Sequence, residues 1–176
     1  MTLETERLIL RPFTMRDAPE TQRLLNDPWV SDGLLSVGHP FELADARKWL
    51  ARKVTHRFAI MTKTSSELCG GIGIHSDARQ PRAEMGYWIG RIFWGNGYAT
   101  EAAHALVKFG FESLSLQRIG AMHFPRNAAS QRVLEKIGMK REGLLRQYAK
   151  KNGRFEDLIV YSVLRGEALV NLQGRF

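Results

Sequence analysis

Residues 94–102, Trp94-Gly95-Asn96-Gly97-Tyr98-Ala99-Thr100-Glu101-Ala102, join a stretch typical of a strand to a stretch typical of a helix. At such a junction the first backbone N–H groups of the helix have no intrahelical partner, and they point forward with the positive end of the helix dipole. Because Gly95 and Gly97 lack a Cβ atom, an anionic group can approach the main chain closely. The stretch therefore predicts a loop that binds a phosphate or diphosphate, with an ordinary strand-to-helix turn as the alternative.

The flanking sequence separates this loop from other phosphate-binding loops. A dinucleotide fingerprint would need glycine where the chain has Thr100, and no Gly-Lys-Ser/Thr follows to make a P-loop. Upstream, residues 84–90 are typical of a strand that runs straight into the loop. Downstream, small and apolar residues recur at helical spacing, at Ala99, Ala102, Ala103, Leu106, Val107 and Phe111. This setting favours the phosphate interpretation.

The rest of the chain predicts a mixture of helices and strands. Strands are expected at 8–11, 57–63, 67–75, 84–89, 118–123, 140–148 and 155–164. Helices are expected at 17–26, from about 43 to 52, at 98–114 and at 128–137. Asn152-Gly153 is the strongest short signal for a hairpin. The strand–helix–strand unit over 84–123 should cross over right-handed, which makes its two strands parallel.

With these blocks in view, the chain resembles the GNAT superfamily of N-acetyltransferases, and within it the RimJ and RimL branch of ribosomal-protein N-terminal acetyltransferases. The likeness covers nearly the whole length. It lies in residues 3–12, in 84–89 with the 95–102 loop, in 127–130 with 135–139, and in Asn152-Gly153 followed by Asp157 and Tyr161. It implies one domain over residues 1–176 with an α/β (α+β) GNAT fold. That fold is a single mixed, mostly antiparallel central sheet with a splayed parallel pair of strands, flanked by about four helices.

The resemblance also implies acetyl-CoA as the co-substrate, with its pantetheine arm in the gap between the splayed strands, and no metal. The residues expected to bind it are Ile89, Trp94, Gly95, Asn96, Gly97, Tyr98, Ala99, Thr100, Asn127 and Ser130. One position departs from the superfamily, because the glutamine or arginine expected three residues before the first loop glycine is Ile92 here. Arg91 is adjacent but out of register. We therefore expect backbone contacts to the phosphates and no contact from that side chain.

Acetyl transfer from a thioester to an amine requires a neutral amine and a proton for the leaving thiolate. An α-amine has a pKa near ~8 and a lysine amine one near ~10.4, a gap worth about 3.3 kcal/mol, so a lysine acceptor needs a base more than an N-terminus does. Glu84 lies on the strand that enters the loop, and we expect its carboxylate to be the general base, acting through water. The alternative is a strand carboxylate paired with a basic neighbour.

The resemblance assigns the remaining catalytic candidates residue by residue. RimL-like enzymes carry a catalytic glutamate on a late strand, and the aligned residue here is Ala149, so that base is missing. Ser130 matches the serine that protonates the leaving thiolate in this branch, while the tyrosine used by many other GNAT enzymes falls on Leu134. A polar residue in the first turn of a helix is the alternative for Ser130. Asn127 is both a good N-cap for the 128–137 helix and the match to the asparagine that contacts the pantetheine amide.

Three other reactive side chains are given structural roles. His75 and His123 fall at or near strand ends, and we expect both to be structural or surface histidines. Cys69, the one cysteine of the chain, is remote in sequence from the loop. We therefore expect direct transfer in a ternary complex and no acetyl-cysteine intermediate.

The charge balance and the hydropathy limit the partners. A net charge of +8, from 26 Lys and Arg against 18 Asp and Glu, favours an anionic ligand such as coenzyme A. The basic residues are scattered, so we expect no direct nucleic-acid binding. Neither an apolar run of about 20 residues nor a signal-peptide core is visible, so we expect a cytoplasmic protein with no membrane partner. Both a monomer and a homodimer remain open.

The sequence thus predicts an N-acetyltransferase that acts on a primary amine, with a protein N-terminus, including that of a ribosomal protein, as the first choice. A small-molecule amine such as an antibiotic or an amino acid is the alternative acceptor. A non-catalytic, ribosome-associated factor that binds acyl-CoA is the alternative function. The acceptor pocket is expected in the N-terminal helices and the last hairpin, in segments that contain Asp27, Trp29, Asp32, Phe41, Trp49 and Tyr148.

Overall fold

The computed structural model describes residues 1–52, 56–76 and 79–167. Its strands form an eight-stranded sheet in the hydrogen-bonded order β1-β2-β3-β4-β5-β6-β8-β7. The chain divides into two compact units, Met1–Gly73 with Tyr87–Ala105 and Ile74–Gly86 with Leu106–Phe176. The mixed α/β fold with one parallel pair of strands confirms the predicted GNAT fold class.

The first unit contains the N-terminal strands and three helices. The strands are β1 (Leu3–Glu4), β2 (Leu8–Pro12), β3 (His56–Thr62) and part of β4 (Leu68–Ser76). In β2, Leu8 and Leu10 are fully buried and alternate with less buried residues, as expected for a strand with one face on a core. β2 pairs antiparallel with β3, from Leu8 with Thr62 to Pro12 with Phe58.

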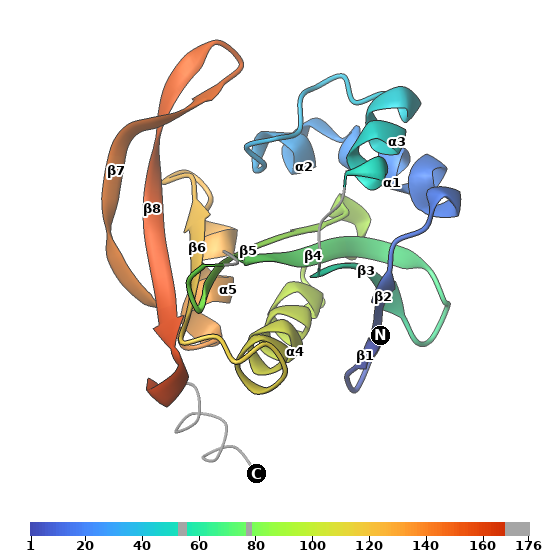
Figure 1. The fold of residues 1–176 in the computed structure, drawn as a ribbon. Coiled ribbons are helices and arrows are strands. Elements are labelled where there is room, and N and C mark those ends of the chain that lie inside the picture. The colour runs from blue at the N-terminus through green and yellow to red at the C-terminus, as the bar shows by residue number, and fades with distance from the viewer. Residues whose placement is uncertain (53–55, 77–78, 168–176) are drawn as a thin grey trace. The chain divides into compact units, whose positions relative to one another are not determined.

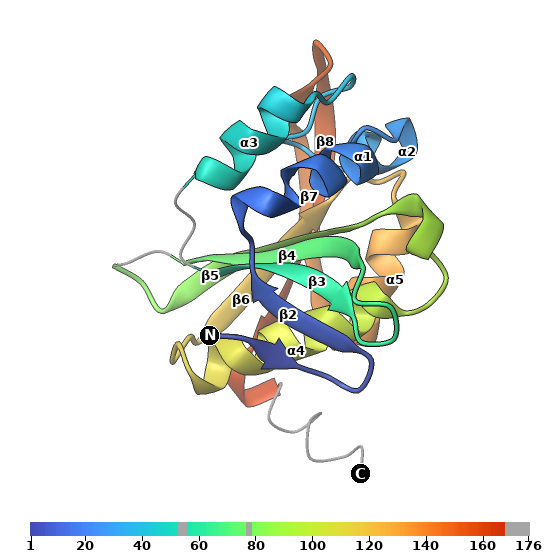
Figure 2. The same ribbon diagram turned by 90° about the vertical axis from the view of Figure 1, so that its right-hand side faces the viewer.

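The helices of this unit are α1 (Ala18–Leu25), α2 (Pro28–Asp32) and α3 (Leu43–Ala51), with a 3-10 turn, η1 (Met15–Asp17), ahead of them. Figure 2 shows α1 and α3 lying close together. Their apolar sides share a core cluster that includes Leu24, Leu25, Phe41, Ala46 and Trp88.

The helix expected at 17–26 is α1, which ends at Leu25, whereas α2 was not predicted from the sequence. Proline fits the first turn of a helix, where its missing N–H is not needed. Asp27 caps the new helix, because its side chain accepts a hydrogen bond from the Trp29 N–H at 2.8 Å.

The predicted strand at 84–89 is the second part of β5 (Arg82–Ile89). It does not enter the glycine loop directly, because a 3-10 turn, η2 (Arg91–Phe93), follows it. The helix after the loop is α4 (Tyr98–Glu112), shorter than the predicted 98–114. Its end is irregular, since the Ser113 and Leu114 N–H groups both bond to the Phe109 carbonyl and Ser115 takes a left-handed φ of 52°.

The second unit contains the C-terminal strands β6 (Arg118–His123), β7 (Lys140–Lys151) and β8 (Arg154–Leu164) and the helix α5 (Ala128–Lys136). The long β7–β8 hairpin is plain in Figure 1. It turns at Asn152 and Gly153, whose φ angles are 49° and 81°, as the Asn-Gly signal predicted. β7 runs to Lys151, beyond the predicted end at 148, because pairing with β8 resumes at Ala149 after an irregularity.

The parallel pair is β5 with β6, as the crossover rule predicted. Its ladder runs from Arg82 with Arg118 to Glu84 with Gly120. β6 is also antiparallel to β8 over its whole length, from Arg118 with Leu164 to His123 with Ile159.

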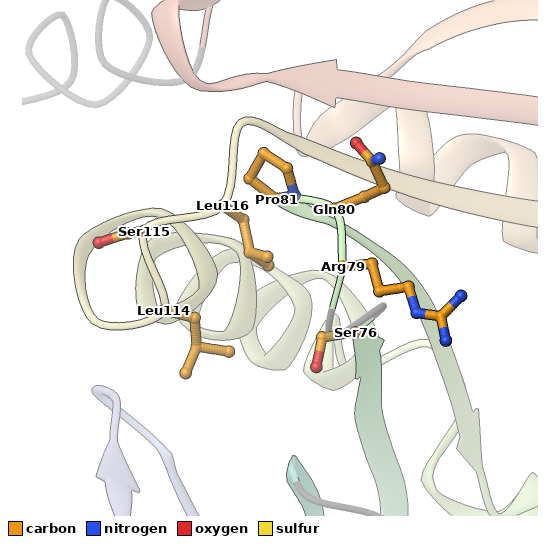
Figure 3. A pocket seen from close by; sticks show the side chains of 7 residues that line it. All are labelled: Ser76, Arg79, Gln80, Pro81, Leu114, Ser115 and Leu116. Atoms are coloured by element: carbon orange, nitrogen blue, oxygen red, sulfur yellow. The ribbon is translucent and has the colours of Figure 1, made fainter.

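In the described residues, no helix is long and apolar enough to cross a membrane. A pocket of about 440 Å³ lies in the second unit, where the end of α4 meets the segment before β5 (Figure 3). It is lined by Ser76, Arg79, Gln80, Pro81, Leu114, Ser115 and Leu116. None of the predicted site residues lines this pocket.

Candidate active site

The glycine loop has the backbone that its sequence predicts. Gly95 and Gly97 have φ angles of 81° and 77°, in the left-handed region that glycine adopts without strain. A Cβ atom at Gly95 would meet nothing within 4 Å, so this glycine is needed for its conformation and not for space. α4 starts at Tyr98, and the Glu101 N–H closes its first turn on the Gly97 carbonyl at 3.1 Å. The N–H groups of residues 98–100 therefore lie in the first turn, where a helix offers no partner.

Side chains of the loop hold its own backbone. The Trp94 indole N–H donates to the Ile89 carbonyl at 2.8 Å, and the Asn96 amide donates to the Phe93 carbonyl at 3.0 Å. Ile89 is buried, whereas Trp94 is half-exposed. The structure thus brings the predicted loop residues together in one turn ahead of α4.

The position where the superfamily carries glutamine or arginine is an exposed Ile92. The neighbouring Arg91 is engaged elsewhere. Its guanidinium lies 3.8 Å from the Asp27 carboxylate and 5.5 Å from the centre of the Trp29 ring. Arg91 therefore packs toward α2.

Glu84 lies on β5 opposite Gly120 of β6, and its carboxylate occupies the space that a side chain at 120 would fill. A Cβ atom on Gly120 would be 2.5 Å from Oε1 and 2.7 Å from Oε2 of Glu84. Glu84 as a whole is exposed, and its carboxylate lies over the backbone position of Gly120. This partial burial raises the pKa of Glu84, opposed by the charges of Arg118 and Arg82 and assisted by that of Glu142.

The alternative for Glu84 was an ion pair with a basic neighbour. The Arg118 guanidinium instead binds Glu142, with 2.5 Å between each Nη and a carboxylate oxygen. Ser162 also donates to Glu142, at 2.7 Å. The guanidinium of Arg118 therefore donates its hydrogen bonds to Glu142 and acts on Glu84 only through its charge.

Asn127 and Ser130 lie together at the start of α5. The Asn127 side-chain oxygen accepts a hydrogen bond from the Ser130 N–H at 3.0 Å, which confirms the predicted N-cap. Ser130 is partly buried in the first turn of α5. Leu134, which aligns with the tyrosine of other GNAT enzymes, is fully buried in the core.

The histidines and the cysteine have the structural places expected of them. His75 is exposed, and His123 is buried with its Nδ1 2.8 Å from the Phe124 carbonyl. Cys69 is fully buried, and burial raises the pKa of its thiol to about 12. Because the thiolate is the nucleophilic form, Cys69 is a poor acyl carrier at neutral pH.

The aromatic residues proposed for the acceptor pocket divide into two groups. Phe41 is buried, and Trp49 packs edge-on against Phe13, with 5.3 Å between ring centres, below the Arg57 guanidinium. Both therefore belong to the core of the first unit. Trp29 and Tyr148 are exposed, at 68% and 59% of their surface, and could contact other molecules.

Two features of these sites were missed by sequence reasoning. The first is Gly120, which makes room for the Glu84 carboxylate; a glycine inside a predicted strand was the available signal. The second is Arg7, whose guanidinium reaches the glycine loop from the N-terminal strands. Its sequence block was recognised, but no local pattern shows which carboxylate it meets.

Comparison with known proteins gives the family. Residues 7–140 match the Acetyltransferase (GNAT) domain. This chain belongs to the GNAT acetyltransferase family. It is 36% identical to an uncharacterized N-acetyltransferase of Bacillus licheniformis, p20, over 174 residues that cover 94% of this chain and 97% of the relative. The crystal structure of a GNAT-family acetyltransferase from Bacillus anthracis matches with a TM-score of 0.87 and 30% identity, over 95% of this chain and all 100% of that one.

A further GNAT relative is similar over part of the chain. YdaF of Bacillus subtilis, named as a candidate ribosomal N-acetyltransferase, is 40% identical over 101 residues, which cover 57% of this chain and 55% of the relative.

The family membership confirms the predicted enzyme class. The protein is an acetyltransferase that depends on acetyl-CoA. Within residues 1–52, 56–76 and 79–167, no group of three or more His, Cys, Asp or Glu side chains could hold a metal ion.

Proposed function

We propose that this GNAT enzyme acetylates a protein N-terminal α-amine by direct transfer in a ternary complex with acetyl-CoA. The observation that carries the choice of amine is the kind of base available. Ala149 stands where RimL-like enzymes have a glutamate, and Glu84 is exposed, with a pKa raised mainly by the partial burial of its carboxyl group. Such a base, working through water, suits an α-amine with a pKa near ~8 far better than a lysine amine near ~10.4.

The proposal gives each predicted residue one task. The backbone N–H groups of residues 95–100, with Ile89 and Trp94 beside them, bind the diphosphate end of acetyl-CoA. Asn127 contacts the pantetheine amide while it caps α5. The relative named for ribosomal N-acetylation supports a ribosomal-protein N-terminus as one acceptor. The whole chain acts as one domain, in the cytoplasm.

The chemical step follows from these assignments. Glu84 accepts the proton of the acceptor amine through a water molecule. The amine nitrogen then attacks the thioester carbonyl, and the carbon–sulfur bond breaks as the tetrahedral intermediate collapses. Ser130 donates its hydroxyl proton to the leaving thiolate, the nitrogen of the new amide releases its surplus proton to water, and Ser130 regains a proton from water. The buried Cys69 thiol, with its pKa of about 12, supports direct transfer over an acetyl-cysteine intermediate.

The test is a mass-spectrometric screen of acceptors with acetyl-CoA. Peptides that begin with Ala, Ser and Met are compared with aminoglycosides, amino acids and polyamines, and release of free thiol is followed in parallel. Acetylation at the peptide α-amine is the expected result, and Glu84→Gln should abolish most of it. Exclusive acetylation of a small amine would replace the proposed acceptor. Tight acetyl-CoA binding without thiol release on any acceptor would indicate a sensor.

A further inference from the structure

The segment between β1 and β2 holds the start of α4 through one carboxylate. Glu101, in the first turn of α4, accepts hydrogen bonds from the Thr5 hydroxyl at 2.6 Å and from the Arg7 backbone N–H at 2.8 Å. The Arg7 side chain adds two contacts to the other carboxylate oxygen, from Nε at 2.7 Å and from Nη2 at 2.6 Å. Residues 94 positions apart in the chain are thus joined by an ion pair in which two nitrogens of the guanidinium share one carboxylate oxygen.

The same guanidinium continues into the glycine loop. Its Nη1 donates to the Asn96 carbonyl at 2.9 Å. Its Nη2 would lie 3.5 Å from a Cβ atom on Gly97, and its carbon lies 5.2 Å from the centre of the Tyr98 ring. Arg7 therefore hydrogen-bonds to Asn96 and lies beside Gly97 and Tyr98, while Glu101 binds its Nε and Nη2.

We propose that Arg7, held by Glu101, is the positioning residue that sets the shape of the glycine loop and with it the affinity for the diphosphate of acetyl-CoA. The inference rests on the proposed assignment of residues 95–100 to that diphosphate. Two residues of this loop have left-handed φ angles, so the directions of its N–H groups depend on how the Asn96 peptide is held. The hydrogen bond from Arg7 Nη1 to the Asn96 carbonyl restrains this peptide.

The positive charge of Arg7 also offsets the negative charge of Glu101 near the proposed diphosphate site. Burial tends to raise the pKa of Glu101, but hydrogen bonds from Thr5 and Arg7 and the charge of Arg7 lower it overall, so the carboxylate stays ionised at neutral pH. A negative charge in the first turn interacts favourably with the positive end of the helix dipole, but it repels an anionic ligand at the same helix end. The positive charge of the Arg7 guanidinium neutralises the Glu101 carboxylate and so reduces this repulsion.

The experiment compares acetyl-CoA with S-acetyl-pantetheine, which has the reacting thioester and the pantetheine amides but no diphosphate. Arg7→Gln is expected to raise Kd and KM for acetyl-CoA about 10-fold, as for a lost charge-assisted hydrogen bond, with kcat at saturation unchanged. The KM for S-acetyl-pantetheine should not move. Arg23→Gln is the matched control, because Arg23 makes an exposed pair with Glu20 in α1, and it should behave as the parent protein.

Arg7→Lys separates geometry from charge, since lysine keeps the charge and loses the fork. It should bind acetyl-CoA nearly as weakly as Arg7→Gln. A lysine variant with unchanged Kd would show that charge alone matters and would overturn the positioning role. So would a glutamine variant that binds acetyl-CoA normally, or that loses S-acetyl-pantetheine to the same degree.

Gly97→Val distinguishes failure of this inference from failure of the loop assignment. Valine at a φ of 77° is strained and projects toward Arg7, so acetyl-CoA binding should be strongly weakened while circular dichroism stays native. Unchanged affinity of Gly97→Val would remove the diphosphate from this loop, and the role of Arg7 with it. If Gly97→Val loses acetyl-CoA and Arg7→Gln does not, only the role of Arg7 falls.

Discussion

At the residue scale, the base proposed at Glu84 has consequences for both the reaction rate and the stability of the protein. Partial burial raises the pKa of Glu84, and a carboxyl with a raised pKa is a stronger base. We predict that Glu84→Gln lowers kcat/KM most strongly below the pKa of the acceptor amine and that higher pH partly restores the rate. The measurement is a pH–rate profile of both proteins with one peptide. Profiles that run parallel at every pH would make Glu84 a structural residue.

The raised pKa of Glu84 also predicts how Glu84→Gln changes the thermal stability, which serves as a control for unfolding. A group whose pKa is raised on folding stabilises the protein below its ordinary value, 4.5 for this carboxyl, and that contribution is lost as the pH rises through the folded value. At about pH 7 the ionised Glu84 therefore lowers the free energy of unfolding, and a neutral glutamine does not. The variant should melt at the same or a higher temperature there. A large fall in Tm would mean that lost activity reflects unfolding.

Ser130 gives a second prediction for a single residue. Its backbone N–H binds Asn127, and alanine keeps that bond, so α5 should remain capped. We predict that Ser130→Ala lowers kcat about 100-fold or more, the usual effect of losing a positioned proton donor, while the Kd for acetyl-CoA changes little. Single-turnover thiol release and calorimetry measure the two quantities. Turnover at the parent rate would leave Ser130 as a helix residue only.

At the element scale, the pairing of β5 with β6 positions the Glu84 carboxylate. Gly120 does not have a positive φ, so its lack of a side chain serves space and not backbone conformation. We predict that Gly120→Ala displaces the Glu84 oxygens and reproduces most of the rate loss of Glu84→Gln, and that the double variant is no slower than either. Gly143→Ala on β7 is the control, because a Cβ atom there meets nothing within 4 Å. Additive losses of rate in the double variant would show that Gly120 acts independently of Glu84.

The three C-terminal strands are joined by a charged contact that should respond to acid. Hydrogen bonds from Arg118 on β6 and Ser162 on β8 lower the pKa of Glu142 on β7 from 4.5 to about 2. A lowered folded pKa stabilises the protein above the ordinary value and is lost as the pH falls toward the folded one. We predict a drop in Tm between these two pH values that Glu142→Gln makes smaller. The pair is partly exposed, so its effect should stay within about 1 kcal/mol and shrink in high salt.

Sequence reasoning succeeded for elements whose signals are local. The Asn152-Gly153 turn, the Asn127 cap and the glycine loop each depend on a few neighbouring residues. The contact of Glu84 with Gly120 depends on the register of two strands separated by α4, and that of Arg7 with Glu101 joins residues 94 positions apart. Pattern and spacing do not fix such distances. For the same reason the sequence predicted which residues form the glycine loop but not what holds its shape.

At the scale of the whole molecule, the net charge of +8 should act on both substrates in opposite directions. It attracts the anionic acetyl-CoA and repels a cationic acceptor, and salt weakens both effects because the Debye length falls to about 10 Å at 0.1 M. We predict that added salt lowers kcat/KM for acetyl-CoA several-fold and leaves kcat unchanged.

The acceptor side of this prediction uses two peptides with the same first residues, one ending in glutamates and one in lysines. At low salt the acidic peptide should have the higher kcat/KM, and the two values should converge at about 0.3 M salt, where long-range fields are screened. Because both peptides present the same α-amine, convergence assigns the difference to the charge of the whole protein. A preference that survives high salt would instead come from side chains that contact the peptide tail. Exposed Trp29 and Tyr148 are the first residues to test in that case.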